Sequence, residues 1–267
     1  MKIARFQVNG KTYFGEVQGD KVIRWDGDPF TQQKPTKDTY DLSKVKLLAP
    51  TEPRAMYASS TVVYPEHSKW VGKTFPQMAG RRHPDRPRSE GLQIDYRAVT
   101  AIIPTGEAIV YPKTAKWLQW EAELVIVIGK KTRYATPQEA KANILGYTLG
   151  NDVSERNWMM GDGSFWRSKN SDTFKPIGPV ISTDVDPKNI QITTIVNGKK
   201  IETYNTGTAI AMPWDFVSTA SQHLTLYPGD LIFFGAAGAP TDIHAGDTVE
   251  IESPGIGTLK SPVVAEK

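Results

Sequence analysis

The chain contains the stretch Trp120-Glu121-Ala122-Glu123-Leu124-Val125-Ile126-Val127-Ile128-Gly129, in which two carboxylates alternate at the start of an apolar, β-branched run. Such a run is typical of a buried strand, and residues two apart in a strand point to the same face. Glu121 and Glu123 should therefore project together beside the core, where an uncompensated charge is unfavourable. The alternative is a surface strand on which both glutamates are solvated.

A third carboxylate follows in a polar break, at Asn151-Asp152. Carboxylate oxygens are the ligands that hard divalent cations take in proteins. A cation bound between Glu121, Glu123 and Asp152 would offset the repulsion between neighbouring buried acids. The pattern therefore indicates a divalent-metal site made by these three residues.

Composition is ordinary for a globular protein. Among 267 residues, 39% are hydrophobic and 23% are charged, and the net charge of +3 does not by itself indicate nucleic acid or membrane as a partner. The absence of cysteine excludes disulfides and thiolate chemistry. Residues 1–6 lack the apolar segment of a signal peptide, and no apolar run approaches the roughly 18 residues of a membrane span. We therefore expect a cytoplasmic protein.

One loop is strongly basic. Residues 81–88 read Arg81-Arg82-His83-Pro84-Asp85-Arg86-Pro87-Arg88. A lid that gathers anions over the site is one interpretation, and a solvated loop or subunit contact is the preferred one. A single basic loop without a recognised module does not make a nucleic-acid-binding protein, so we expect no nucleic-acid partner.

The first part of the chain is predicted to be a small antiparallel domain. Residues 1–50 read as short strands, the first two joined by a hairpin turn at Asn9-Gly10. The proline-marked link at Leu48-Ala49-Pro50 separates this domain from residues 51–267.

The remainder, residues 51–267, is predicted to be mostly strands with few helices. Thr136-Pro137-Gln138-Glu139 has the form of a capping box with proline at the first helical position. The helix should run through Ile144 and stop near Gly146. A second helix is expected at residues 214–224, and strand signals dominate elsewhere. The predicted class is α+β and β-rich.

An ordered set of motifs resembles the fumarylacetoacetate hydrolase family. No single motif is specific, whereas the combination in this order is. The motifs are Glu121-x-Glu123-Leu124, Val127-Ile128-Gly129, Gly146-Tyr147-Thr148, Asn151-Asp152-Val153-Ser154-x-Arg156, Lys169, Asp172-Thr173-Phe174-x-Pro176-x-Gly178-Pro179, Val196-Asn197-Gly198, Leu226-x-Pro228-Gly229-Asp230 and Gly246-Asp247.

The resemblance implies a catalytic domain with a mixed β-roll that binds Mg2+ (or Mn2+ or Ca2+) through Glu121, Glu123 and Asp152, and a homodimer. It also implies a metal-dependent enzyme that acts on a small keto acid. The expected reaction is hydrolytic C–C cleavage of a 2-keto or 1,3-dicarbonyl acid, such as an acylpyruvate, through a metal-stabilised enolate. The alternatives are a decarboxylase or isomerase on the same scaffold, and a non-catalytic member that only binds metal or ligand.

Four further residues take roles by the same resemblance. Lys169 matches an active-site lysine that holds a substrate oxygen, and Thr173 matches a substrate-contacting threonine. Arg156 would bind substrate or orient Asp152. Arg97, in Tyr96-Arg97, stands where the family has the lysine of Phe-x-Lys, and would contact substrate.

The chain departs from the family where water is activated. Hydrolytic members carry Asn-Tyr-x-x-His-x-x-Glu, and here the best match is Val63-Tyr64-Pro65-Glu66-His67-Ser68-Lys69-Trp70. His67 is the candidate base, but Trp70 replaces the glutamate that would orient it. Glu66 is adjacent in sequence, and neighbours on a helix do not face each other. The change argues against water-mediated hydrolysis and leaves decarboxylation or isomerisation open.

Overall fold

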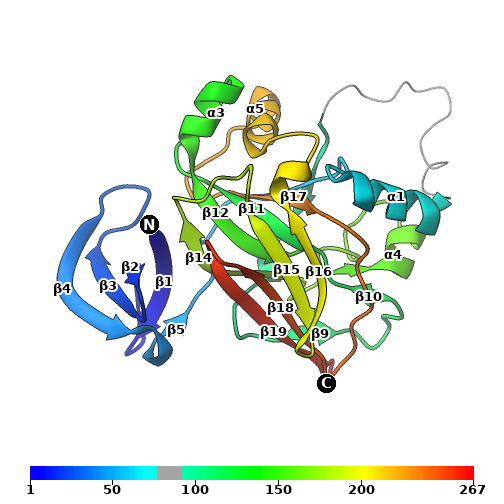
Figure 1. The fold of residues 1–267 in the computed structure, drawn as a ribbon, viewed down its shortest axis with the longest axis horizontal. Coiled ribbons are helices and arrows are strands. Elements are labelled where there is room, and N and C mark those ends of the chain that lie inside the picture. The colour runs from blue at the N-terminus through cyan, green and yellow to red at the C-terminus, as the bar shows by residue number, and fades with distance from the viewer. Residues whose placement is uncertain (77–91) are drawn as a thin grey trace.

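The structure is a computed structural model that describes residues 1–76 and 92–267. The basic loop at residues 81–88 lies outside the described residues, so its role stays a prediction. The described part is rich in strands and has few helices, as predicted from the sequence (Figure 1).

One large mixed sheet runs through the molecule. Its strands, in order of pairing, are β4 (Lys34–Asp41), β3 (Lys21–Asp26), β2 (Lys11–Gln18), β1 (Lys2–Val8), β14 (Lys175–Ser182), β12 (Ile144–Asn151), β11 (Ala122–Ile128), β17 (Leu231–Ala236), β6 (Met56–Ser59) and β7 (Ile94–Arg97), with β5 (Lys46–Leu47) beside β1 and β8 (Ile102–Pro104) beside β14. Most pairs are antiparallel, and β14–β8 and β17–β6 are parallel. The sheet therefore joins the predicted N-terminal strands to the strand that carries Glu123.

A second sheet packs beside the first one. Its order is β16 (Lys199–Asn205), β15 (Gln191–Val196), β18 (Thr248–Ser253), β19 (Gly257–Ala265) and β9 (Ile109–Tyr111). A separate short pair is formed by β10 (Leu118–Gln119) and β13 (Ser154–Glu155). Parallel and antiparallel pairs coexist here too, since β19 and β9 run parallel.

The helices lie outside the sheets. They are α1 (Pro65–Thr74), α3 (Pro137–Asn143), α4 (Arg156–Gly161) and α5 (Pro213–His223), with short 3-10 turns at Leu42–Lys44, Val99–Ala101 and Thr206–Thr208. Helices α3 and α5 pack together on one side of the body (Figure 1). Over the described ranges, none of the helices is both long and apolar enough to cross a membrane.

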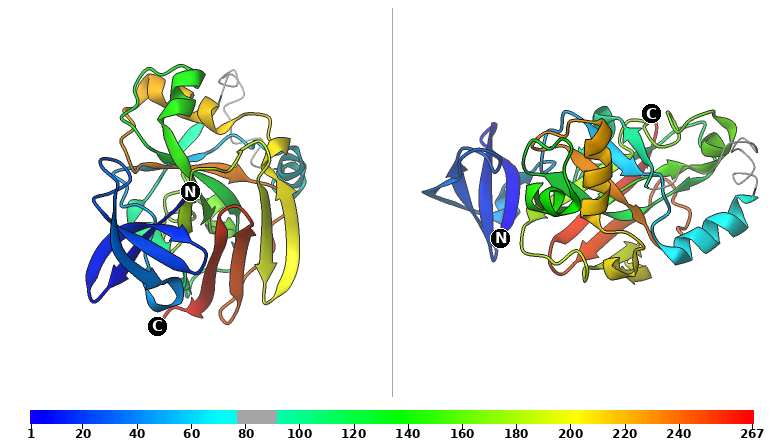
Figure 2. Two further views of the ribbon diagram at one scale, coloured as in Figure 1. Left: turned by 60° about the vertical axis from the view of Figure 1, so that its left-hand side comes forward. Right: turned by 90° about the horizontal axis from the view of Figure 1, so that it is seen from above.

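The N-terminal strands form a separate lobe at one end of the long axis (Figure 2). The predicted hairpin is confirmed, because β1 and β2 pair in register around Asn9 and Gly10, whose φ angles are 49° and 77°. These left-handed angles suit asparagine and glycine in a tight hairpin turn. Strand β1 also pairs with β14, so the lobe is joined to the body by backbone hydrogen bonds.

The capping box at Thr136 is confirmed, but the predicted end of its helix is wrong. The Thr136 side chain accepts from the Glu139 backbone N–H, and Glu139 bonds back to Thr136. Helix α3 stops at Asn143, whereas the prediction ran to Gly146. Ile144 already begins β12, which pairs on both sides with β11 and β14. Sheet pairing of this buried segment outweighs local helix propensity.

Strand β11 is buried on both faces, which explains its unbroken apolar sequence. Leu124, Ile126 and Ile128 pack into one core cluster, whereas Val125 and Val127 pack into the other. A strand between two covered faces reads as a continuous hydrophobic run. The charged side chains Glu121 and Glu123, at or just before the start of this strand, are therefore buried in the interior.

Gly150 allows β12 to approach β11 and β17 closely. It pairs opposite Glu123, and an added Cβ would lie 2.5 Å from both Phe233 Cε1 and Val125 Cγ2. We expect Gly150→Ala to lower the free energy of unfolding by about 1–3 kcal/mol, because extra volume in a packed interior forces neighbours to shift. Denaturant unfolding measures this loss.

Gly161→Ala is the matched control, since a Cβ there meets nothing within 4 Å. It should leave the free energy of unfolding nearly unchanged. Equal stability of Gly150→Ala and wild type would contradict the packing described here.

Candidate metal and active site

The register of β11 and β12 brings the three candidate carboxylates together. Ala122 pairs opposite Asn151, and the Asp152 backbone N–H donates to the Glu121 carbonyl at 2.9 Å. The Asn151 side chain accepts from the Glu121 backbone N–H at 3.0 Å. Glu121 lies just before β11 rather than within it, and this bond fixes its backbone beside Asp152.

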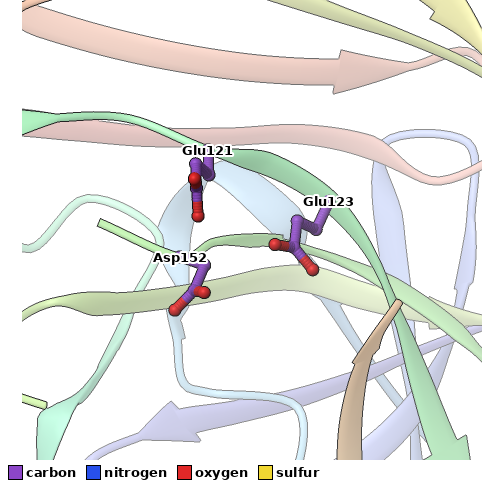
Figure 3. Close-up of side chains that lie close together, drawn as sticks. All are labelled: Glu121, Glu123 and Asp152. Carbon is purple, nitrogen blue, oxygen red and sulfur yellow. The ribbon is translucent and has the colours of Figure 1, made fainter. Parts of the chain in front are cut away.

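The three carboxylates share one buried space. One oxygen from each of Glu121, Glu123 and Asp152 lies within 4.8 Å of the others, and all three residues are buried (Figure 3). The surface-strand alternative is thereby wrong. Three carboxylate oxygens at this spacing are a donor set that fits a hard divalent cation.

Cations compensate Asp152 from three directions. Arg97 donates to both of its carboxylate oxygens at 3.1 Å, and Lys175 Nζ and Lys169 Nζ each lie 2.7 Å from one oxygen. Burial alone raises the pKa of Asp152, but Arg97, Lys169 and Lys175 outweigh it and hold that pKa well below its usual value. Asp152 is therefore ionised in the folded protein.

Glu121 is compensated by two cations. Arg156 Nη2 donates to its Oε1 at 2.7 Å, and Lys169 Nζ bonds to its Oε2. Burial opposes ionisation, yet Arg156 and Lys169 lower the pKa of Glu121 to about 2. Gln119 holds Arg156 in place by accepting from its Nε at 2.8 Å.

Glu123 differs from its two neighbours. Its Oε2 accepts from the Gly235 backbone N–H at 2.6 Å, and the described residues form no ion pair with it. Burial, followed by the charges of Asp152 and Glu121, raises the pKa of Glu123 well above its usual value. The site thus holds one carboxylate whose charge a bound cation would offset.

His67 approaches the carboxylates from α1. Its Nδ1 lies 2.8 Å from the Gly238 carbonyl, which only accepts, so Nδ1 carries the hydrogen. Its Nε2 is 3.9 Å from Glu121 Oε1. Burial lowers the pKa of His67 against the opposing effect of Glu121. The ring is therefore neutral near pH 7, with its basic nitrogen on the side of the carboxylates.

The residues beside His67 do not replace the missing glutamate. Trp70 packs against the imidazole with ring centroids 5.1 Å apart and a tilt of 31° between the rings, and it offers no acceptor to the histidine. Glu66 is exposed and pairs with Lys69 at 2.7 Å. This placement agrees with the expectation that Glu66, as the helix neighbour of His67, does not face the imidazole.

A cavity of about 130 Å3 joins these groups. Its polar lining includes Arg97, Arg156 and Lys169 with the carboxylates. Its apolar lining comes from Val63, Val71, Phe75, Met159, Phe165 and Ala236. A ligand with an anionic, oxygen-rich end and a short apolar or flexible remainder would match both kinds of lining.

The structure places Arg156 and Thr173 differently from their predicted roles. Arg156 contacts Glu121 and Gln119, whereas Asp152 is held by Arg97. Thr173 does not line this cavity, and its hydroxyl accepts from the Val110 backbone N–H at 2.8 Å. The substrate contact assigned to Thr173 stays a prediction.

Sequence reasoning missed two side chains of the candidate site. Lys175, fully buried, bonds to Asp152, and burial lowers its pKa to about 8. Gln119 supports Arg156. The signal for Lys175 was available, because a lone lysine opens the otherwise apolar segment that becomes β14. Nothing in the sequence distinguishes Gln119 from a surface glutamine.

Comparison with known proteins identifies the fold and the family. The model for "Fumarylacetoacetate (FAA) hydrolase C-terminal" matches residues 58–264, and "Rv2993c-like, N-terminal" matches residues 1–50. Protein Rv2993c of Mycobacterium tuberculosis is 38% identical over 88% of this chain and 85% of its own length. The rat mitochondrial oxaloacetate tautomerase Fahd2a is 33% identical over 62% of this chain, and the match spans 56% of that enzyme's length.

Solved structures agree with this assignment. The 5-carboxymethyl-2-hydroxymuconate delta-isomerase of Mycobacterium smegmatis superposes with a TM-score of 0.87 at 33% identity, and covers all of both chains. The maleylpyruvate hydrolase of Sphingobium sp. SYK-6, solved with manganese(II) and pyruvate, has a TM-score of 0.79 at 23% identity over all of both chains. With its β-rich fold and its match over residues 58–264, the chain belongs to the fumarylacetoacetate hydrolase family.

Proposed function

We propose that this chain is a divalent-metal-dependent enzyme that interconverts the keto and enol forms of a small 2-oxo acid. The observation that carries the proposal is the neutral His67 ring, whose Nε2 faces a buried cluster of three carboxylates and the cations around them. A base near such a cluster suits proton removal from carbon next to a polarised carbonyl.

Glu121, Glu123 and Asp152 would hold the ion. The uncompensated charge on Glu123 supports this assignment, because the described residues offer it only one backbone N–H. When bound, the ion would supply Lewis acidity to the keto and carboxylate oxygens of the substrate. Mg2+ and Mn2+ both accept such oxygen ligands.

The proton transfer would be carried by His67. Its Nε2 takes the proton from the carbon beside the keto group, the electron pair of the broken C–H bond forms a C=C bond, and the π electrons of the carbonyl move to its oxygen. A proton then reaches that oxygen to give the enol, and the reverse sequence restores the ketone. No co-reactant is consumed, since one C–H bond is exchanged for one O–H bond.

The charges around the cavity support a substrate with more than one negative charge. Four buried cations, Arg97, Arg156, Lys169 and Lys175, surround the three carboxylates. A divalent ion would add to this excess of positive charge. A dicarboxylic 2-oxo acid, or the enolate formed from it, would be stabilised there.

Isomerisation is favoured over water-mediated cleavage by the surroundings of His67. Trp70 stands where hydrolytic members carry the glutamate, so the ring has no carboxylate directly bonded to Nδ1. The names of the isomerase and tautomerase relatives support the same reaction class. A single proton transfer asks less of the base than activation of water.

C–C cleavage of an acylpyruvate is the second candidate. The apolar residues that line the cavity, which include Phe75 and Phe165, would accept an acyl tail that a tautomerase on a small diacid does not need. The hydrolase named among the solved structures supports this alternative on fold alone. Assembly into a homodimer remains a prediction.

A substrate panel distinguishes these reactions. Oxaloacetate and an acylpyruvate are incubated with metal-stripped protein, with and without Mg2+ or Mn2+, and with metal alone as the blank. We expect metal-dependent keto–enol exchange of oxaloacetate, followed by enol absorbance, above the rate of the blank. Two carbon fragments from the acylpyruvate would instead indicate C–C hydrolysis, and carbon dioxide release would indicate decarboxylation.

Replacement of Glu123 tests the metal site. Glu123→Gln removes a carboxylate whose pKa is raised in the folded state. Between 4.5 and its raised pKa in the folded state, Glu123 ionises in the unfolded chain but stays protonated in the folded one, so the stability of the metal-free wild type falls as pH rises. The metal-free variant should therefore become increasingly stable relative to wild type as pH rises, yet lose the increase in Tm that Mg2+ gives to wild type.

Thermal unfolding across pH, with and without Mg2+, measures both effects. Glu252→Gln on β18 is the control, and it should respond to Mg2+ as wild type does. An undiminished Mg2+ response in Glu123→Gln would remove that residue from the site.

Replacement of His67 tests the base. His67→Gln should lower kcat by about 10²–10⁴-fold, the usual contribution of a positioned general base. The increase in Tm on adding Mg2+ should be kept, because His67 is not a proposed ligand. Near-normal turnover in this variant would assign the proton transfer to another group.

A further inference from the structure

Glu202 lies outside the cavity lining but close to the peptide that holds His67. It comes from β16 in the second sheet, far in sequence from α1. Its carboxyl group is directed at the turn after β17, where Gly238 and Ala239 lie. A half-buried acid in this position has no part in the proton transfer described above.

The fit between Glu202 and the turn is close. A Cβ added to Gly238 would lie 1.3 Å from Glu202 Oε1, so the carboxylate occupies the space that any other side chain would need. Gly238 also has a φ of +65°, in the left-handed region that favours glycine. The φ angle favours glycine here, and the absence of a side chain leaves room for the Glu202 carboxyl group against the turn.

One peptide group connects the acid and the histidine. The Gly238 carbonyl accepts from His67 Nδ1 at 2.8 Å, and the Glu202 carboxyl group lies against the same peptide, whose N–H, on Ala239, lowers the pKa of that group. An amide that donates to an anion places more negative charge on its own oxygen, so its two hydrogen bonds strengthen each other. The acid thus acts on the imidazole across a single peptide.

We propose that Glu202 is a positioning residue for His67, acting through the Gly238–Ala239 peptide in place of the glutamate that Trp70 has replaced. The carboxylate anchors the turn and strengthens the bond that keeps hydrogen on Nδ1 and the basic lone pair on Nε2. This inference rests on the proposed function only for its effect on turnover. Its effect on the imidazole is independent of the substrate.

The burial of Glu202 agrees with this role. Its Oε2 is buried and has no hydrogen-bond partner within residues 1–76 and 92–267. Burial raises the pKa of Glu202 to about 7, against the opposing effect of the Ala239 N–H. Measurements at pH 8 therefore examine the ionised carboxylate.

The test uses the full-length, Mg2+-loaded protein labelled with 15N. The chain has four histidines, and the signals absent from His67→Gln assign the ring nitrogens of His67. In wild type we expect the Nδ1–H tautomer with a strongly hydrogen-bonded proton. Glu202→Gln keeps an acceptor for Ala239 but removes the charge, and should shift that proton toward weaker hydrogen bonding.

Kinetics give the second measurement. Glu202→Gln should lower kcat about 5–10-fold with KM and the Mg2+-induced rise in Tm unchanged, because substrate and metal contacts are untouched. Glu202→Ala, which also loses the anchor, should lower kcat at least as much. Glu252→Gln, an acid-to-amide change on β18 in the same sheet, should match wild type in both measurements.

The outcomes separate the two proposals. Unchanged His67 ring signals in both Glu202 variants would overturn the positioning role, whatever the activity. Shifted signals in Glu202→Gln, in a protein that turns over nothing in the substrate panel, would support the positioning role and contradict the proposed reaction. Shifted signals with an unchanged kcat would show that the peptide connection has no effect on catalysis, and would overturn the inference.

Discussion

The structure depends on the compensation of three carboxylates buried at the end of a strand. An isolated charge in the protein interior is strongly unfavourable. Four buried cations from separate parts of the chain lie beside these carboxylates. Asp152 and Glu121 are paired in this way, whereas Glu123 is left with one backbone N–H. A cation bound beside Glu123 would correct this imbalance.

The sheets determine where these charges meet. Strand β11 is covered on both faces, so its first residues are held inside the protein, and its pairing with β12 brings Asp152 to Glu121. Close approach of the strands requires a residue without a side chain at Gly150. Packing and chemistry are therefore linked at the same strand pair, and a change that separates the strands would also separate the carboxylates.

The orientation of His67, the candidate base, is set by a backbone carbonyl rather than by a neighbouring side chain. His67 is held by the carbonyl of Gly238, and the same peptide reaches Glu202 on the second sheet. The second sheet thereby contacts a site whose candidate metal ligands lie on, or directly beside, strands β11 and β12 of the first sheet. Loss of a direct carboxylate at position 70 is compatible with a functional imidazole under this arrangement.

The sequence by itself determined the family, the β-rich class, the hairpin at Asn9-Gly10 and the cap at Thr136, because each depends on local patterns or ordered motifs. It also predicted the acidic triplet as a candidate metal site, since two acids at the start of an apolar strand form a recognisable pattern. Only the tertiary structure decided where α3 ends, which cation holds which carboxylate, and that Thr173 does not line the cavity. Contacts such as that between Glu202 and Gly238 join residues far apart in the chain, so strand pairing and burial, rather than local sequence, create them.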